Sequence, residues 1–201
     1  MTEPDPANYP WWLASRSAGI VAFVLIASAV ILGLVLASRF SWPPGMKRKV
    51  LKVHQQIALA GLAAIGAHGA LLLGDSFLNP GVTGITIPFT LSYRPAWTGL
   101  GILAGYLALL LGPTFYVRRR IGARRWRRIH QATVVVYVLA VLHSLGSGTD
   151  GASLWFTIMV ACSAVPILAL LILRYGRRTK TPARAPIRPR PSIAADPTPG
   201  A

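Results

Sequence analysis

Hydrophobic residues are gathered into five long runs, and the Gly, Pro and charged residues collect in the shorter segments between them. None of the five runs contains an Asp or Glu. A helix of about 20 apolar residues crosses the ~30 Å hydrocarbon core of a bilayer. The pattern therefore predicts an all-α membrane protein, with five transmembrane helices in a bundle at residues 17–38, 50–73, 97–117, 129–146 and 154–173.

The first run has the character of a true span rather than of a cleaved signal peptide. A signal peptide has a basic start and an apolar core of about 7 to 15 residues. Here the acidic Glu3 and Asp5 come first, and the apolar run is longer. We expect residues 1–16 to form an outer N-terminal segment and residues 17–175 to form the five-helix domain.

The remaining segments differ in character. The Pro- and Arg-rich residues 176–201 lack the apolar content to build a core, which predicts a disordered cytoplasmic tail. Segment 74–96 is the longest connection between spans, and its length and the alternation at 85–89 predict a partly ordered lid. Residues 118–128 are expected to form a short cationic loop.

The net charge of +16 is compatible with nucleic-acid binding until its distribution is considered. Of the 21 Lys and Arg residues, 19 fall in three clusters, at 39–52, 118–128 and 174–190. These clusters occupy alternate ends of the spans, and positive residues concentrate on the cytoplasmic side of a membrane. We therefore expect a multi-pass protein of the plasma membrane, with the N-terminus outside, the C-terminus cytoplasmic, lipid as its partner and no nucleic acid.

The four histidines all lie in the second and fourth spans. His54 and His68 have the spacing H-x13-H, and His130 and His143 have the spacing H-x12-H. Both spans run in the same direction under the predicted topology. His54 and His130 then share a depth near the inner face and form the inner pair, while His68 and His143 form the outer pair. At 1.5 Å per residue the two levels are roughly 20 Å apart.

Two imidazoles at one depth can fill both axial positions of a haem iron. Such an iron has no open position for oxygen or substrate, so its expected function is electron transfer. The spacing therefore predicts two b-type haems stacked across the membrane. On the second span Ala58, Gly61 and Ile65 share a helical face with the histidines, and small residues such as Gly61 would let a macrocycle approach the backbone. Small residues also promote helix packing, which remains an alternative.

The fourth span does not fit an ideal helix. Thirteen residues at 100° each leave His143 about 140° around the helix from His130. The sequence therefore predicts either two laterally offset haems or a distortion of the helix near Tyr137. That tyrosine lies between the two levels, where it could assist tunnelling or simply pack.

Two other classes of protein remain open at this point. A transition-metal transporter could use the same histidines, although the spans hold no acid and the histidines have no neighbouring Met or Cys. A His-containing metal-binding membrane protein belongs to the same alternative. A purely structural membrane protein would leave the matched depths as coincidence.

The paired spacings on helices separated by one span resemble the ferric reductase-like transmembrane domain, the family of NADPH oxidases and eukaryotic ferric reductases. Tyr93-Arg94-Pro95 and Trp126-Arg127-Arg128-Ile129-His130 agree more weakly. The resemblance covers about residues 12–175 and implies the same two haem pairs. A bacterial haem subunit of a methionine-sulfoxide-reducing system is similar too, with less agreement of motifs.

The resemblance implies a subunit that carries electrons from the inner to the outer haem, and then to ferric iron or a separate protein such as a flavoprotein. Relatives add a dehydrogenase with flavin and nicotinamide sites, whereas this chain shows no glycine-rich dinucleotide fingerprint. Arg16 and Arg94 are the expected partners of the outer haem propionates. Near the inner haem the candidates are Lys52, Arg127 and Arg128, of which the last two are interpreted as membrane anchors.

Overall fold

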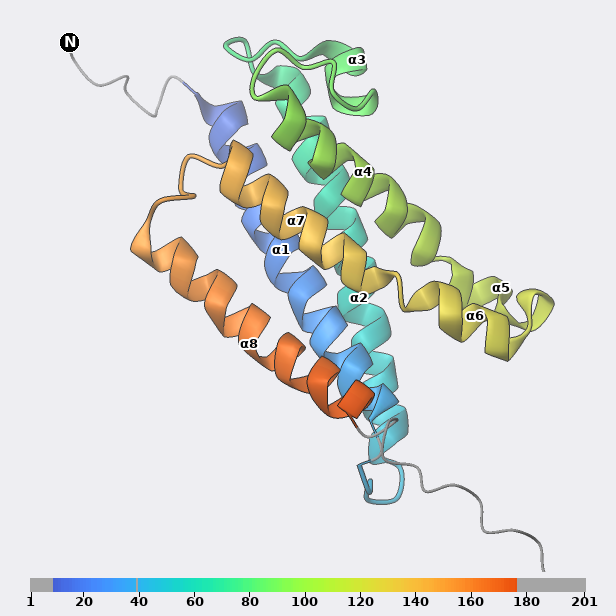
Figure 1. The fold of residues 1–201 in the computed structure, drawn as a ribbon. Helices are drawn as coiled ribbons and strands as arrows, with labels where there is room; N and C mark the ends of the chain where they lie inside the picture. Colours follow the sequence, from blue (N-terminus) through green and yellow to red (C-terminus); the bar gives the residue numbers. More distant parts are fainter. Residues whose placement is uncertain (1–8, 39, 177–201) are drawn as a thin grey trace, which may run out of the picture.

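A computed structural model describes residues 9–38 and 40–176 of the chain (Figure 1). The described residues form α-helices, one short 3₁₀-helix and connecting turns, with no strand among them. Residues 1–8, half of the expected N-terminal segment 1–16, lie outside the described residues. So does the expected tail, apart from its first residue, Gly176.

Four helices within the described residues are long and apolar enough to cross a membrane, or five if the bent pair Pro95–Leu111 and Thr114–Ile121 counts as one span. They confirm the all-α membrane class. The orientation of the termini stays a prediction. The candidate spans are α1 (Pro10–Ala37), α2 (Met46–Leu71) with η2 (Leu72–Gly74), α4 (Pro95–Leu111) with α5 (Thr114–Ile121), α6 (Ala123–His130) with α7 (Thr133–Ser147), and α8 (Leu154–Gly176).

Two helix pairs build the bundle. α1 packs along α2, and α4 packs along α7, while α8 lies against α1 at one edge (Figure 1). One apolar cluster joins α1, α7 and α8 through residues such as Phe23, Tyr137 and Ile167. A second joins α4 and α7 to α1 and α2, through Ala108, Leu111 and Val136 with Leu62 and Ile65 beside them. The four helices that surround the histidines are thus held together by apolar contacts.

The first span starts seven residues earlier than the sequence predicted. Pro10 occupies the first turn of α1, where its missing N–H would have had no partner in any case. Trp11 is therefore helical, and its ring lies directly on Gly74 at the end of η2, in the place of a side chain. This contact ties the beginning of α1 to the end of α2.

The third span is broken rather than straight. α4 and α5 meet at Gly112-Pro113 with a bend of 54°. Proline has no backbone N–H and its ring clashes with the carbonyl four residues earlier, which bends a helix at this point. The predicted span 97–117 is therefore bent after Leu111, and its last residues belong to α5.

The predicted cationic loop 118–128 is instead a helical hairpin. α5 and α6 are joined at Gly122, whose φ of 86° requires a residue without a Cβ. The hairpin projects from one end of the bundle in Figure 1. A second break follows at Gln131–Ala132, between α6 and α7.

The long connection 74–96 contains a short helix, α3 (Gly81–Thr86). Residues 85–89 do not form a strand, although their alternation is typical of one. The Tyr106 hydroxyl of α4 donates a hydrogen bond to the Thr86 carbonyl at 2.5 Å, and the Phe89 ring lies on Gly99. The connection is thereby ordered against α4, whereas its role as a lid remains a prediction.

Candidate metal centres

The structure brings the four histidines together as two pairs. The rings of His54 and His130, the inner pair, have centroids 6.2 Å apart and planes at 85°. The rings of His68 and His143, the outer pair, have centroids 6.1 Å apart and planes at 72°. In each pair one ring comes from α2 and the other from the α6–α7 segment.

These separations fit two rings that share one metal ion. A ligating imidazole nitrogen lies about 2 Å from its metal and about 1 Å from its own ring centroid, so the two centroids should be roughly 6 Å apart. Each pair offers only two protein nitrogens. Haem iron needs two, because the porphyrin supplies the other four, whereas a bare zinc ion takes about four ligands. Among the described residues no group of three or more His, Cys, Asp or Glu could hold a metal.

Three of the four rings are oriented by backbone carbonyls. His54 Nδ1 lies 3.0 Å from the Ala29 oxygen, His68 Nδ1 lies 2.8 Å from the Ser15 oxygen, and His143 Nδ1 lies 2.9 Å from the Trp97 oxygen. A carbonyl only accepts, so Nδ1 carries the proton and Nε2 is the nitrogen free to bind metal. No Nε2 atom has a hydrogen-bond partner among the described residues, and this donor set fits axial ligation of a haem.

Ser15 adds a second bond in the outer pair. Its hydroxyl donates to the His68 carbonyl at 2.8 Å and also lies 3.1 Å from His68 Nδ1. The side chain is only 1% exposed, so the hydroxyl is committed to this contact. Sequence reasoning missed Ser15, because a single Ser at the start of a span carries no signal of its own.

His130 is held differently. Its Nδ1 is buried and has no hydrogen-bond partner among the described residues. Its ring instead stacks on Trp126, with centroids 5.0 Å apart and planes at 21°. Trp126 in turn donates from Nε1 to the Thr114 hydroxyl at 3.2 Å. Trp126 of α6 therefore connects His130 of the inner pair to Thr114 of α5.

The break after His130 removes the difficulty of the 13-residue spacing. α6 ends at His130 and α7 begins at Thr133, so the two histidines do not belong to one continuous helix. The predicted distortion exists, but it lies at Gln131–Ala132 and not near Tyr137. Tyr137 itself is buried in the α1–α7–α8 core, with its hydroxyl 2.7 Å from the Ser163 hydroxyl.

Gly61 does not face the space between the histidines. A Cβ at this position would lie 3.4 Å from the side chains of Leu25 and Ile26 on α1. The small residues on α2 were expected to allow either the approach of a macrocycle or close helix packing. Gly61 contributes to helix packing.

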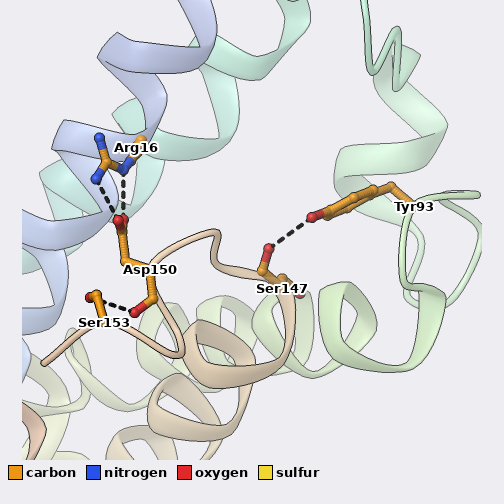
Figure 2. A network of polar contacts seen from close by, with 5 residues as sticks. All are labelled: Arg16, Tyr93, Ser147, Asp150 and Ser153. Atoms are coloured by element: carbon orange, nitrogen blue, oxygen red, sulfur yellow. Dashed lines mark hydrogen bonds and ion pairs between the residues drawn. The ribbon is translucent and has the colours of Figure 1, made fainter. Parts of the chain in front are cut away.

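Arg16 is engaged in a bidentate ion pair. Its Nε and Nη2 donate to the two carboxylate oxygens of Asp150, each at 2.7 Å (Figure 2). The pair joins α1 to the connection between α7 and α8, and Ser153 holds that connection through the Asp150 carbonyl at 2.7 Å. Arg16 follows Ser15, which bonds His68, so the ion pair lies at about the level of the outer pair along α1.

Arg94 lies against the last residues of α7. Its Nη1 donates to the Gly146 carbonyl at 2.6 Å, and the Tyr93 hydroxyl donates to the Ser147 carbonyl at 3.3 Å (Figure 2 shows the Tyr93 contact). Both bonds cap the carbonyl end of α7, a few residues after His143. The inner candidates Lys52, Arg127 and Arg128 are exposed.

Several apolar helices around two histidine pairs define a membrane protein with two candidate metal centres. Residues 18–141 match the family described as ferric reductase like transmembrane component. The match covers more than half of the chain, and the chain belongs to this family. It includes three of the histidines and ends two residues before His143. No curated protein and no solved structure matches the chain significantly.

Proposed function

We propose that the chain is a di-haem b cytochrome, an electron-transfer subunit of a ferric reductase-like oxidoreductase in the plasma membrane. Family membership implies a component of a membrane oxidoreductase. The inner pair would hold one haem and the outer pair the other. A haem iron between two imidazoles accepts and releases one electron without an open coordination position.

One observation carries this proposal. Two separate histidine pairs have ring centroids 6.1–6.2 Å apart, and in three of the four rings the Nδ1 proton is already bound to a carbonyl. Such a bond fixes the tautomer and the ring orientation of a metal-ligating histidine. The chain thus offers two Nε2 atoms oriented in this way at the outer pair and one, that of His54, at the inner pair.

The residues between the two levels support a path for electrons without a path for ions. Leu62 and Ile65 lie between the histidines of α2, and they pack with Leu111 and Val136. An apolar layer of this kind disfavours water between the centres, which supports the passage of an electron over that of a hydrated ion. Electrons would enter at the inner pair and leave at the outer pair, to ferric iron or to a separate protein such as a flavoprotein.

Absorption spectra of the purified protein, oxidised and reduced with dithionite, test the proposal. We expect low-spin haem b and about two haems per chain. Replacing His68 or His143 with Ala should remove the same haem, and replacing His54 or His130 should remove the other. Gln56→Ala, an exposed change on α2, is the control and should retain both. A haem-free preparation that binds zinc through these histidines would favour the transporter instead.

A further inference from the structure

Three histidines contact a neighbouring helix in the same way, and we call each of these contacts a seat. In each seat the ring is bonded to a backbone carbonyl, and a glycine follows that carbonyl by four residues. His68 bonds the Ser15 oxygen beside Gly19, His54 bonds the Ala29 oxygen beside Gly33, and His143 bonds the Trp97 oxygen beside Gly101.

In each seat the ring occupies the space that a side chain would take. A Cβ on Gly19 would lie 3.0 Å from His68 Nδ1, and a Cβ on Gly33 would lie 3.3 Å from His54 Cε1. A Cβ on Gly101 would overlap the ring of His143. The three seats thus form a series, from tightest at Gly101 to loosest at Gly33.

The geometry of a helix explains why glycine is needed. The carbonyl of residue i accepts the N–H of residue i+4, and its second lone pair stays available. A side chain at i+4 lies over the turn that precedes it and would cover that oxygen. Without the side chain, a histidine from the next helix reaches the same carbonyl.

The spacing of the seats matches the spacing of the ligands. Gly19 and Gly33 are separated by 14 residues on α1, as are His68 and His54 on α2, and the order is reversed because the helices run antiparallel. On α4 the corresponding second seat would fall close to the bend at Gly112-Pro113, where that helix ends. His130 accordingly has no seat, and its Nδ1 is the one left without a partner among the described residues.

We propose that Gly19, Gly33 and Gly101 are positioning residues, which set the orientation and basicity of three axial histidines by opening a helix carbonyl to Nδ1. The inference rests on the proposed di-haem function and adds to it. A carbonyl bond to Nδ1 strengthens the imidazole as a donor and favours the ferric iron. Displacing the ring from its seat should therefore raise the reduction potential of that haem alone.

Single Gly→Ala variants of the full chain test this proposal, with spectra, haem content and a redox titration as readouts. Gly101→Ala should lose the outer haem, about half of the total, or convert it to a high-spin form. Gly19→Ala should keep the outer haem at a raised potential. Gly33→Ala should raise the inner potential by a smaller amount and leave the outer one unchanged.

Two matched glycines are the controls. Gly105 lies one turn after Gly101 on α4, and its Cβ would make an ordinary contact with Ile65 at 3.5 Å. Gly66 lies near His68 on α2, and its Cβ would meet nothing within 4 Å. Gly105→Ala and Gly66→Ala should keep both haems and both potentials, because neither glycine lies under a histidine ring.

The outcomes separate the two proposals. A wild-type protein without haem would end the proposed function. Two intact haems with unchanged potentials in all three seat variants would overturn the positioning role alone, as would equal damage in Gly105→Ala. If Gly101→Ala does not accumulate in the membrane, the milder Gly19→Ala and Gly33→Ala decide, since each should shift one haem and leave the other as an internal control.

Discussion

The outer and inner histidine pairs have nearly the same ring separation but are held in different ways. In the outer pair both Nδ1 atoms bond to carbonyls, and the Ser15 hydroxyl adds a further bond. In the inner pair only His54 has such a bond, while His130 relies on stacking against Trp126 at a break between helices. A similar separation of the two rings is thus reached through carbonyl bonds at the outer pair and through aromatic packing and one carbonyl bond at the inner pair.

The difference follows from where helices continue and where they stop. α1 runs uninterrupted past both histidines of α2 and offers a carbonyl to each. α4 ends at Leu111, before it could do the same for His130. What α4 cannot supply at the inner level comes from the α5–α6 hairpin, whose Trp126 reaches His130.

The prediction with the largest expected effect concerns the orientation of the protein in the membrane. The names outer pair and inner pair rest on this orientation, which was predicted from the distribution of Lys and Arg. Reporter fusions after Asp75 or Asp150 should be active outside the cell, and a fusion after Arg120 should be active in the cytoplasm. The expected result is all-or-none, because the charge bias sets the orientation of the whole bundle. The opposite pattern of reporter activity would mean that His54 and His130 form the outer pair and that the α5–α6 hairpin lies outside.

Replacing Trp126 should affect the inner haem alone. Trp126→Ala removes the stack on His130, and a half-buried aromatic contact of this kind contributes about 2 kcal/mol. The dissociation constant of the inner haem should rise roughly 30-fold, since about 1.4 kcal/mol corresponds to tenfold. Haem content and the reduced spectrum measure the resulting loss of haem.

Trp126→Phe is the matched control, because it keeps a ring for stacking and loses only the bond to Thr114. It should retain most of the inner haem. Equal loss of both haems in Trp126→Ala would indicate general unfolding and would remove the contrast between the two levels.

The contrast also shows how far the sequence could predict this molecule. Hydropathy predicted the spans, and the matching spacings of the histidines on two spans that run in the same direction predicted which rings would meet. The ends and breaks of the helices were predicted less well. Pro10 extends α1 outward, and Gly112-Pro113 breaks a run that reads as continuous, because a hydropathy average does not register a single residue that alters backbone hydrogen bonding.

The seats were not predictable because they depend on register between helices. Gly19, Gly33 and Gly101 look like ordinary small residues in apolar runs, and nothing in one sequence aligns them with histidines on other helices. The role of Trp126 was also missed, although its spacing from His130 is one helical turn. The signal was there, but segment 118–128 was interpreted as a loop, in which such spacing has no meaning.

The ion pair at the outer level should tune the outer haem with opposite signs. Asp150→Asn leaves the Arg16 charge uncompensated and should raise the outer potential, whereas Arg16→Gln leaves the carboxylate and should lower it. Both side chains are partly exposed, at 35% for Arg16 and 21% for Asp150, so screening keeps each effect near roughly 1 kcal/mol. A one-electron potential would then shift by a few tens of millivolts.

The double variant of Arg16 and Asp150 is the check on this assignment. It should return the outer potential close to that of the wild type, because the two charges cancel. Shifts of the same sign in both single variants would mean that the pair acts by holding the α7–α8 connection and not by its charges.

The smallest effect is expected at Arg94, which caps α7 without a carboxylate partner among the described residues. Its guanidinium donates to the Gly146 carbonyl three residues after His143, so its positive charge remains uncompensated near the outer pair. A nearby cation favours the reduced iron, whose charge is lower by one, and Arg94→Ala should therefore lower the outer potential. Arg94→Lys keeps the charge and should have less effect.

Tyr93→Phe is the control, because it removes the neighbouring hydrogen bond to the Ser147 carbonyl without changing any charge. It therefore measures how much of the effect comes from holding the end of α7. An outer potential that is unmoved in Arg94→Ala, or lowered equally in Tyr93→Phe, would reduce Arg94 to an anchor for the end of α7.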